Sequence, residues 1–178
     1  MEKKKHGKHK YLGSYVPNLN GEYEYTGVYY KIDVPVESLK RIKSWCAVMA
    51  TVIAVLFVLA GLTNAAGSRI MYVMLPYVAA VLPIAFMLAD VYRIARYQKP
   101  MTQKQYDQSV VQLKAVTIAT LALIAISAVG DIVFLAFFCA AKDVARELIY
   151  LSACIAIIAV SVALLVYQRR IICVDCQK

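Results

Sequence analysis

A chain of 178 residues with 61% hydrophobic and 17% charged residues is too apolar for a water-soluble domain, in which these shares are about 45–50% and about 25%. Its mean hydropathy of +0.61 agrees with this, so we expect a single domain that is largely solvated by lipid. The net charge of +9 would suggest nucleic acid in a soluble protein. Here the basic residues flank apolar runs. We therefore expect them to set the orientation of the chain in the membrane and to contact anionic lipid headgroups, rather than to bind nucleic acid.

Residues 1–34 form a basic, tyrosine-rich region ahead of the first apolar run. Residues 1–10 hold five lysines and two histidines, which is typical of a disordered tail that can lie on an anionic membrane surface. Polar and aromatic residues then alternate from Glu22 to Tyr25, and Thr26-Gly27 fits a tight turn. The segment is therefore either a small β-hairpin or an irregular tyrosine-rich stretch at the membrane interface.

Residues 35–168 contain four apolar runs, each long enough to cross a bilayer as a helix. The expected spans are about residues 45–62, 70–89, 115–138 and 148–167. The predicted fold class is an all-α membrane protein, a four-helix antiparallel transmembrane bundle. It is followed by a short tail at residues 169–178.

Local signals add detail to these spans. Pro35 suits the first position of a helix that starts as a basic amphipathic turn along the membrane interface. Pro76 and Pro83 are expected to bend the second span, because each removes a backbone donor. In the connection 91–114, Thr102 resembles the N-cap of an amphipathic helix that leads into the third span.

Two spans carry small residues at helical spacing, which permits the close approach of a neighbouring helix or of a second copy of the chain. In the first span these residues are Ala47, Ala50 and Ala54, and in the fourth they are Ser152, Ala156, Ala159 and Ala163. They predict which faces of the two helices form contacts.

The basic residues outside the spans predict the orientation of the chain. Seventeen lie in the N-terminal region, the 91–114 connection and the C-terminal tail, whereas three, Arg69, Lys142 and Arg146, lie in the two short connections. Because positive residues are retained on the cytoplasmic side, both termini of this multi-pass cell membrane protein are expected in the cytoplasm. Only two short hairpin loops then face outward, which excludes an extracellular receptor domain.

Asp131 interrupts the third apolar run, and an ionisable residue inside a span is a candidate functional group. Counting from Ala115, a rise of about 1.5 Å per residue places it about 24 Å along a core of about 30 Å. Arg69 is the cation expected at that depth, so Asp131 and Arg69 are predicted to form an intramembrane polar clasp. The alternative is a carboxylate that couples transport to a proton or another cation. Towards the other side, Asp90 and Arg93 are expected to form a local i,i+3 pair.

Five cysteines are present, an odd number, and three of them lie within or beside apolar runs, which excludes an extracellular disulfide framework. Cys173 and Cys176 form a C-x-x-C pair in the tail, a weak signal for thiol exchange or for half of a zinc site. The sequence lacks H-E-x-x-H, G-x-S-x-G and P-loop motifs. An enzyme, a cofactor and a metal are therefore not expected.

Two functions fit these features. The first is a non-catalytic membrane scaffold or accessory protein. It would bind a membrane or cytoplasmic partner, or another copy of itself, through the small-residue faces and the N-terminal region. The second is a small transporter or channel that uses Asp131 and the proline-bent second span. Four spans enclose little room, so transport would require a homo-oligomer. The lipid bilayer, with its anionic headgroups, is the surrounding partner in both cases.

Overall fold

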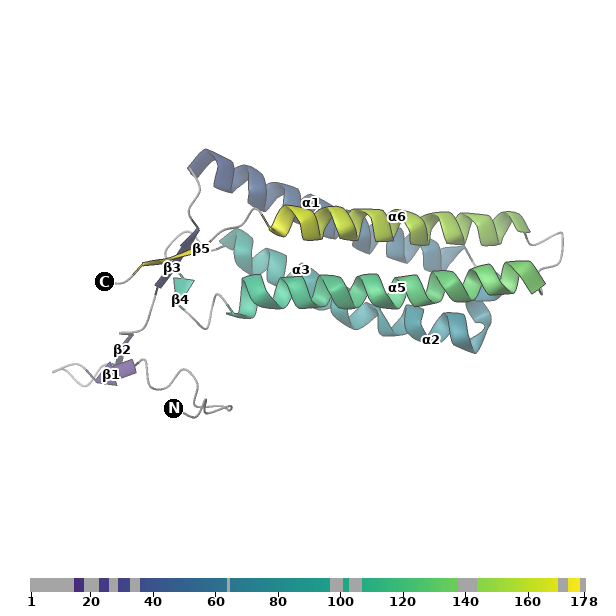
Figure 1. The fold of residues 1–178 in the computed structure, drawn as a ribbon, viewed down its shortest axis with the longest axis horizontal. Helices are drawn as coiled ribbons and strands as arrows, with labels where there is room; N and C mark the ends of the chain where they lie inside the picture. Colours follow the sequence, from purple (N-terminus) through teal and green to yellow (C-terminus); the bar gives the residue numbers. More distant parts are fainter. Residues whose placement is uncertain are drawn as a thin grey trace.

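The computed structural model consists mainly of four long helices that lie side by side (Figure 1). Each is long and apolar enough to cross a membrane, which confirms the four predicted membrane-length helices: Lys40–Leu62, Met71–Arg96, Ser109–Phe137 and Val144–Gln168. The structure describes residues 15–17, 23–25, 29–32, 36–63, 65–96, 101–102, 107–137, 144–169 and 173–176. Residues 1–10, and with them the predicted basic tail, lie outside the described residues.

The first two spans differ in continuity. Helix α1, Val36–Leu62, is unbroken over 27 residues, so the amphipathic turn expected to lie apart along the interface is instead the first part of the spanning helix. The second span consists of α2, Met71–Ala79, and α3, Val81–Arg96, which meet at Ala80. Pro83 has no backbone N–H to donate one turn back, so the helical ladder is interrupted just before it. The second span is therefore interrupted at Ala80, between the two prolines, and the bend expected from Pro76 and Pro83 stays a prediction.

The third and fourth spans begin earlier than the sequence analysis expected. Helix α5, Gln112–Phe137, is preceded by a π-helical turn, η3, Asp107–Val111, so the lead-in is helical and runs directly into the span. Helix α6, Val144–Gln168, starts four residues before the expected boundary at Leu148. This earlier start places one further acidic residue inside the bundle. A short 3-10 turn, η2, Gly67–Arg69, leads into α2.

Five short strands lie at one end of the bundle, called here the strand end (Figure 1). The opposite end, where η2 lies and where α5 ends and α6 begins, is called the hairpin end. Strand β1, Tyr15–Pro17, pairs antiparallel with β2, Tyr23–Tyr25. Strand β3, Tyr29–Ile32, is the centre of a second antiparallel sheet, between β4, Met101–Thr102, and β5, Cys173–Cys176.

This strand pairing corrects two expectations. The segments on either side of Thr26-Gly27 do not pair with each other, because β2 pairs with β1, and β3 pairs with β4 and β5. A central strand forms ladders on both of its edges, which an isolated two-stranded hairpin cannot offer. Thr102 lies in β4 opposite Tyr29 and is therefore not a helix N-cap.

The four spans form a ring in which α1 packs against α3 and α6, and α5 packs against α6 and against both halves of the second span. The buried side of α6 follows an alternating spacing of three and four residues: Glu147, Tyr150, Cys154, Ile157, Ser161, Leu164 and Gln168. The buried side of α5 follows a similar spacing: Leu113, Thr117, Thr120, Ile124, Ser127, Ala128, Asp131 and Phe134. This is the pattern of helices that pack nearly parallel to one another.

The two small-residue faces have different surroundings. Ala50 of α1 is fully buried, with Ala47 and Ala54 half-buried beside it, so this face packs inside the bundle. The face of α6 formed by Ser152, Ala156, Ala159 and Ala163 is exposed or half-buried. Within one copy of the chain, α6 therefore packs through its other face.

Each span contributes one buried isoleucine to the interior of the bundle: Ile53, Ile84, Ile124 and Ile157. All four belong to the same buried core. Along α5, buried polar side chains lie on both sides of Ile124, Thr117 and Thr120 towards the strand end and Ser127 and Asp131 towards the hairpin end.

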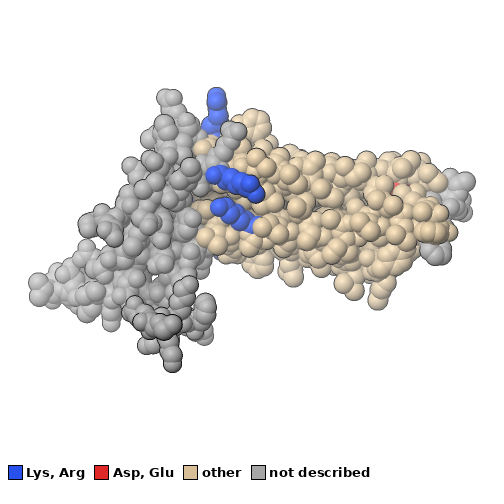
Figure 2. Space-filling view, in the orientation of Figure 1, with Lys and Arg blue, Asp and Glu red and all other residues tan. Residues whose placement is uncertain are grey.

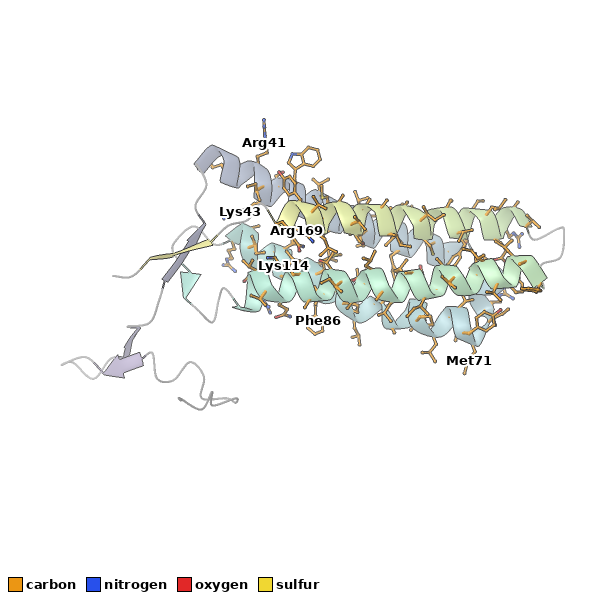
Figure 3. All side chains as sticks on the ribbon, in the orientation of Figure 1. Arg41, Lys43, Met71, Phe86, Lys114 and Arg169 are labelled. Carbon is orange, nitrogen blue, oxygen red and sulfur yellow. The ribbon has the colours of Figure 1, made fainter. Side chains whose placement is uncertain are left out.

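Most of the described lysines and arginines lie towards the strand end, whereas Arg69 and Arg146 are exposed at the hairpin end. Figure 3 labels four basic residues near the strand end, Arg41, Lys43, Lys114 and Arg169, whereas Met71 lies towards the hairpin end. On the face shown in Figure 2, the described lysines and arginines gather beside the strand end, and the rest of the described surface is almost entirely uncharged. The long uncharged surface is what a bilayer core requires of its protein neighbours.

Candidate functional site: a buried acid pair

Two carboxylic side chains are buried together at the hairpin end. Asp131 lies in α5, six residues before the helix ends at Phe137, and Glu147 lies in the first turn of α6. Both side chains are fully shielded from solvent, with relative exposures of 0%. They are close enough for a direct hydrogen bond when one of them carries a proton. Acidic side chains are almost never fully buried unless they are paired, so this pair is a candidate site.

Few hydrogen-bond donors serve this pair. The backbone N–H of Gly67 donates to Oε1 of Glu147 at 2.9 Å. Oε2 of Glu147 and both carboxyl oxygens of Asp131 have no hydrogen-bond partner among the described residues. Three fully buried oxygens therefore lack a donor, which is costly in a low-dielectric interior unless a proton or a cation is present.

Gly67 is the backbone support of the pair. A Cβ added at this position would lie 2.7 Å from Oδ1 of Asp131 and 2.9 Å from Oε2 of Glu147, so both oxygens converge on the same small space. It would also lie 2.7 Å from Cδ1 of Phe134. Only glycine lets the η2 turn approach α5 and α6 this closely.

The predicted clasp between Asp131 and Arg69 is not observed as a hydrogen-bonded pair. Neither oxygen of Asp131 has a hydrogen-bond partner among the described residues, and the charged side chain it faces is Glu147. Arg69 lies at the same end, as expected, but its side chain is exposed at the end of η2. The turn presents the backbone of Gly67 to the pair instead of the guanidinium two residues later.

Glu147 was missed by the sequence analysis because the fourth span was drawn from Leu148. Its signal is nevertheless in the sequence. Glu147 is followed by Tyr150, Cys154 and Ile157 at alternating spacings of three and four, so it continues the buried face of α6 by one turn. The expected start of the fourth span at Leu148 followed the last charged residue and so left Glu147 outside the span.

A second polar layer lies one turn deeper. The hydroxyls of Ser127 and Tyr150 are 2.8 Å apart, and the Ser127 hydroxyl donates to the carbonyl of Val73 at 3.1 Å. The Tyr150 ring is tilted against Tyr77, with a centroid distance of 5.6 Å, and Tyr77 stacks on Phe57 at 4.4 Å. These contacts join all four spans just below the acid pair and fix the positions of α5 and α6.

The strand end has its own buried polar groups. Nη1 of Arg93 donates to Oδ1 of Asp90 at 3.1 Å, which confirms the predicted i,i+3 pair. Asp90 is fully buried, whereas the Arg93 side chain is 47% exposed. Nearby in the interior, the Gln168 amide donates to the Thr117 hydroxyl at 3.3 Å. Asp90 is thus a buried carboxylate with a cation, in contrast to the pair at the hairpin end.

The C-x-x-C pair lies in β5. Its four residues are extended and pair with β3, with Cys173 opposite Ile32 and Cys176 opposite Tyr29. Three residues of extended chain separate two Cα atoms by about 10 Å, whereas a disulfide needs about 4.4–6.8 Å. The strand conformation therefore does not permit a disulfide between Cys173 and Cys176.

Comparison with known proteins gives no relative for this chain: no family model, no curated protein and no solved structure matches it. The fold and the buried pair define a four-span helical membrane protein with an acidic interior site. What this protein does is therefore argued from its own residues.

Proposed function

We propose that the chain is a multi-pass scaffold or accessory protein of the cell membrane, without catalysis, whose termini are both cytoplasmic. The observation that carries this proposal is the three-stranded sheet at the strand end. It joins the N-terminal region, the connection between the second and third spans, and the C-terminal tail into one unit. A sheet built from three separate segments offers a composite surface for a partner, which none of them offers alone.

The distribution of charge supports this orientation. Seventeen of the 20 lysines and arginines lie in residues 1–43, 91–114 and 169–178, the segments that connect to the strand end. Positive residues of this kind are retained in the cytoplasm and attract anionic headgroups. The partner is expected to be another membrane protein, a cytoplasmic protein or a second copy of the chain. The exposed small-residue face of α6, described above, is available for a helix of such a partner.

A proline in the central strand tests the proposal. Tyr30 pairs with Met101 on one side and with Asp175 on the other, so Tyr30→Pro removes a ladder hydrogen bond and disfavours the central strand. We expect the full-length variant to insert normally and to lose its partners in affinity purification from crosslinked membranes. Recovery would fall to the level of a chain lacking residues 1–34.

The matched control is Glu24→Pro, which changes β2 in the other sheet, where Glu24 pairs with Val16. This variant is expected to keep the partners. If Tyr30→Pro or the deletion of residues 1–34 leaves the recovered partners unchanged, the scaffold proposal loses its main support. Protection of tags at both termini from protease added to intact cells tests the orientation separately.

A second candidate, a small oligomeric transporter or channel, is favoured by one observation, the buried Asp131 with unpartnered oxygens. The buried core contains apolar side chains from all four spans, so conduction would need this core to open or a path between copies. In proteoliposomes, Asp131→Asn would then abolish a proton-linked flux while leaving thermal stability intact. Unchanged flux, or no flux in the unmodified protein, would count against transport.

A further inference from the structure

The acid pair at the hairpin end carries an inference that goes beyond the scaffold function and does not depend on it. Asp131 and Glu147 are both fully buried, and their side chains interact directly. Of their four carboxyl oxygens, only Oε1 of Glu147 receives a hydrogen bond from a described residue. Two ionised carboxylates at this distance would repel each other, and burial strengthens the repulsion.

We propose that Asp131 and Glu147 form a proton-binding site in which one proton is shared by the two carboxyls. Protonation of one acid removes one negative charge from the dry interior. It also creates the missing donor, because the new O–H donates to an oxygen of the remaining carboxylate. The site then holds one proton and one negative charge, as close pairs of buried carboxyls do.

The surroundings assign the proton to Asp131 and the charge to Glu147. Glu147 lies in the first turn of α6 and accepts the Gly67 N–H, and both the helix N-terminus and the amide stabilise a negative charge. Asp131 lies six residues before the end of α5, far from the N-terminus of that helix, and no described donor reaches it.

The structure describes several other titratable groups around the pair. On α6, Cys154 lies close enough to Asp131 to interact electrostatically, and Tyr150 contacts Cys154 and the Ser127 hydroxyl of α5. On η2, the exposed Arg69 lies two residues from Gly67, and on α6 the exposed Arg146 precedes Glu147. From α2, Tyr72 lies beside Gly130 next to Asp131. None of them donates a hydrogen bond to Asp131, so among the described residues the missing donor comes from within the pair.

The site has a short route to one membrane face. Glu147 is in the first turn of its helix, so the pair lies about one turn from the hairpin end. In the other direction, buried apolar residues of the core, Ile124 and Ile157 among them, lie between the pair and the polar groups of the strand end. The proton is therefore expected to exchange with the aqueous phase at the hairpin end.

Infrared spectroscopy of the purified full-length protein in lipid vesicles tests the proposal. At neutral pH the unmodified protein is expected to show the C=O stretch of a buried protonated carboxylic acid. This band should shift when aspartate is labelled with ¹³C at its side-chain carboxyl, and should stay when glutamate is labelled. It should disappear in Asp131→Asn and persist in Asp90→Asn, because Asp90 has the cationic Arg93 as its partner and lies at the other end of the bundle.

The measurement on the unmodified protein decides the question even if a variant fails to fold. Absence of the acid band at neutral pH would overturn the proposal, and so would its persistence in the double variant Asp131→Asn, Glu147→Gln. Vesicles containing Na⁺ are compared with vesicles containing choline at equal ionic strength and pH. If Na⁺ removes the acid band and raises the melting temperature, the ligand is a metal ion and the proton assignment is wrong. None of these outcomes affects the affinity-purification test of the three-stranded sheet, so the two proposals can fail independently.

Discussion

Replacing Gly67 by alanine is expected to lower the free energy of unfolding by about 1–3 kcal/mol, the usual range for an extra methyl in a packed interior. The new Cβ would overlap Oδ1 of Asp131, Oε2 of Glu147 and Cδ1 of Phe134, at 2.7, 2.9 and 2.7 Å. The η2 turn must then move away from α5 and α6, which also breaks the N–H donation to Glu147. Thermal unfolding in detergent, followed by circular dichroism, measures the loss.

Gly61→Ala is the matched control. Gly61 lies in α1, is exposed, and its added Cβ would meet Tyr77 no closer than 3.4 Å. Alanine favours a helix over glycine by about 1 kcal/mol, so this variant should be as stable as the unmodified protein or slightly more so. Equal melting temperatures for the variants Gly67→Ala and Gly61→Ala would show that the close approach at η2 is not a constraint.

The second large effect is expected at Ile124. Ile124 is fully buried at the middle of α5, and Ile124→Ala removes three carbon atoms from the buried core to which all four spans contribute. Lost contacts and the resulting cavity should cost about 2–5 kcal/mol. In a membrane protein the loss comes chiefly from packing, because lipid is as apolar as the side chain itself.

Ile126→Ala tests whether this cost is specific to the buried position. Ile126 lies two residues further along the same helix and is 56% exposed. The same chemical change there should alter the free energy of unfolding by less than about 0.5 kcal/mol. If the two variants unfold alike in the same detergent, Ile124 is not part of a packed core.

The four spans were predictable because each is an apolar run whose length alone meets the requirement of a bilayer. Their inward faces were less obvious, since a helix in lipid can be apolar on all sides. The fourth span illustrates this: its small residues, Ala156 and Ala159 among them, suggested one packing face, but α6 packs through Tyr150 and Ile157. In the first span, by contrast, Ala50 is both small and buried.

The candidate site was half predictable. Asp131 is conspicuous because it interrupts an apolar run, and its place near one end of the bundle followed from helical rise. Its partner was assigned by opposite charge to Arg69, whereas the structure brings Glu147 to it. Which residues of two helices come close depends on which faces of the helices pack, and the sequence does not show this directly. In addition, Glu147 lay outside the expected fourth span because charged residues were taken to mark the ends of spans.

The strand pairing was beyond local sequence rules. Thr26-Gly27 signals a turn between neighbouring segments, but β3 pairs with β4 and β5, which lie beyond the second and fourth spans. Pairing between strands so far apart in the sequence depends on where the ends of the helices lie in the folded bundle. The alternation of tyrosines with polar residues identified residues that form strands. Which of these strands pair with each other depends on the assembled bundle.

The position of β5 in the sequence determines when the three-stranded sheet can form during synthesis of the chain. Strand β5 follows the fourth span in the sequence. During synthesis β3 therefore cannot pair with β5, the longer of its two partner strands, until all four helices have been made. A chain that stalls after two or three spans leaves this strand edge open to chaperones or proteases. The complete sheet can therefore form only after the fourth span and the segment that follows it have been synthesised.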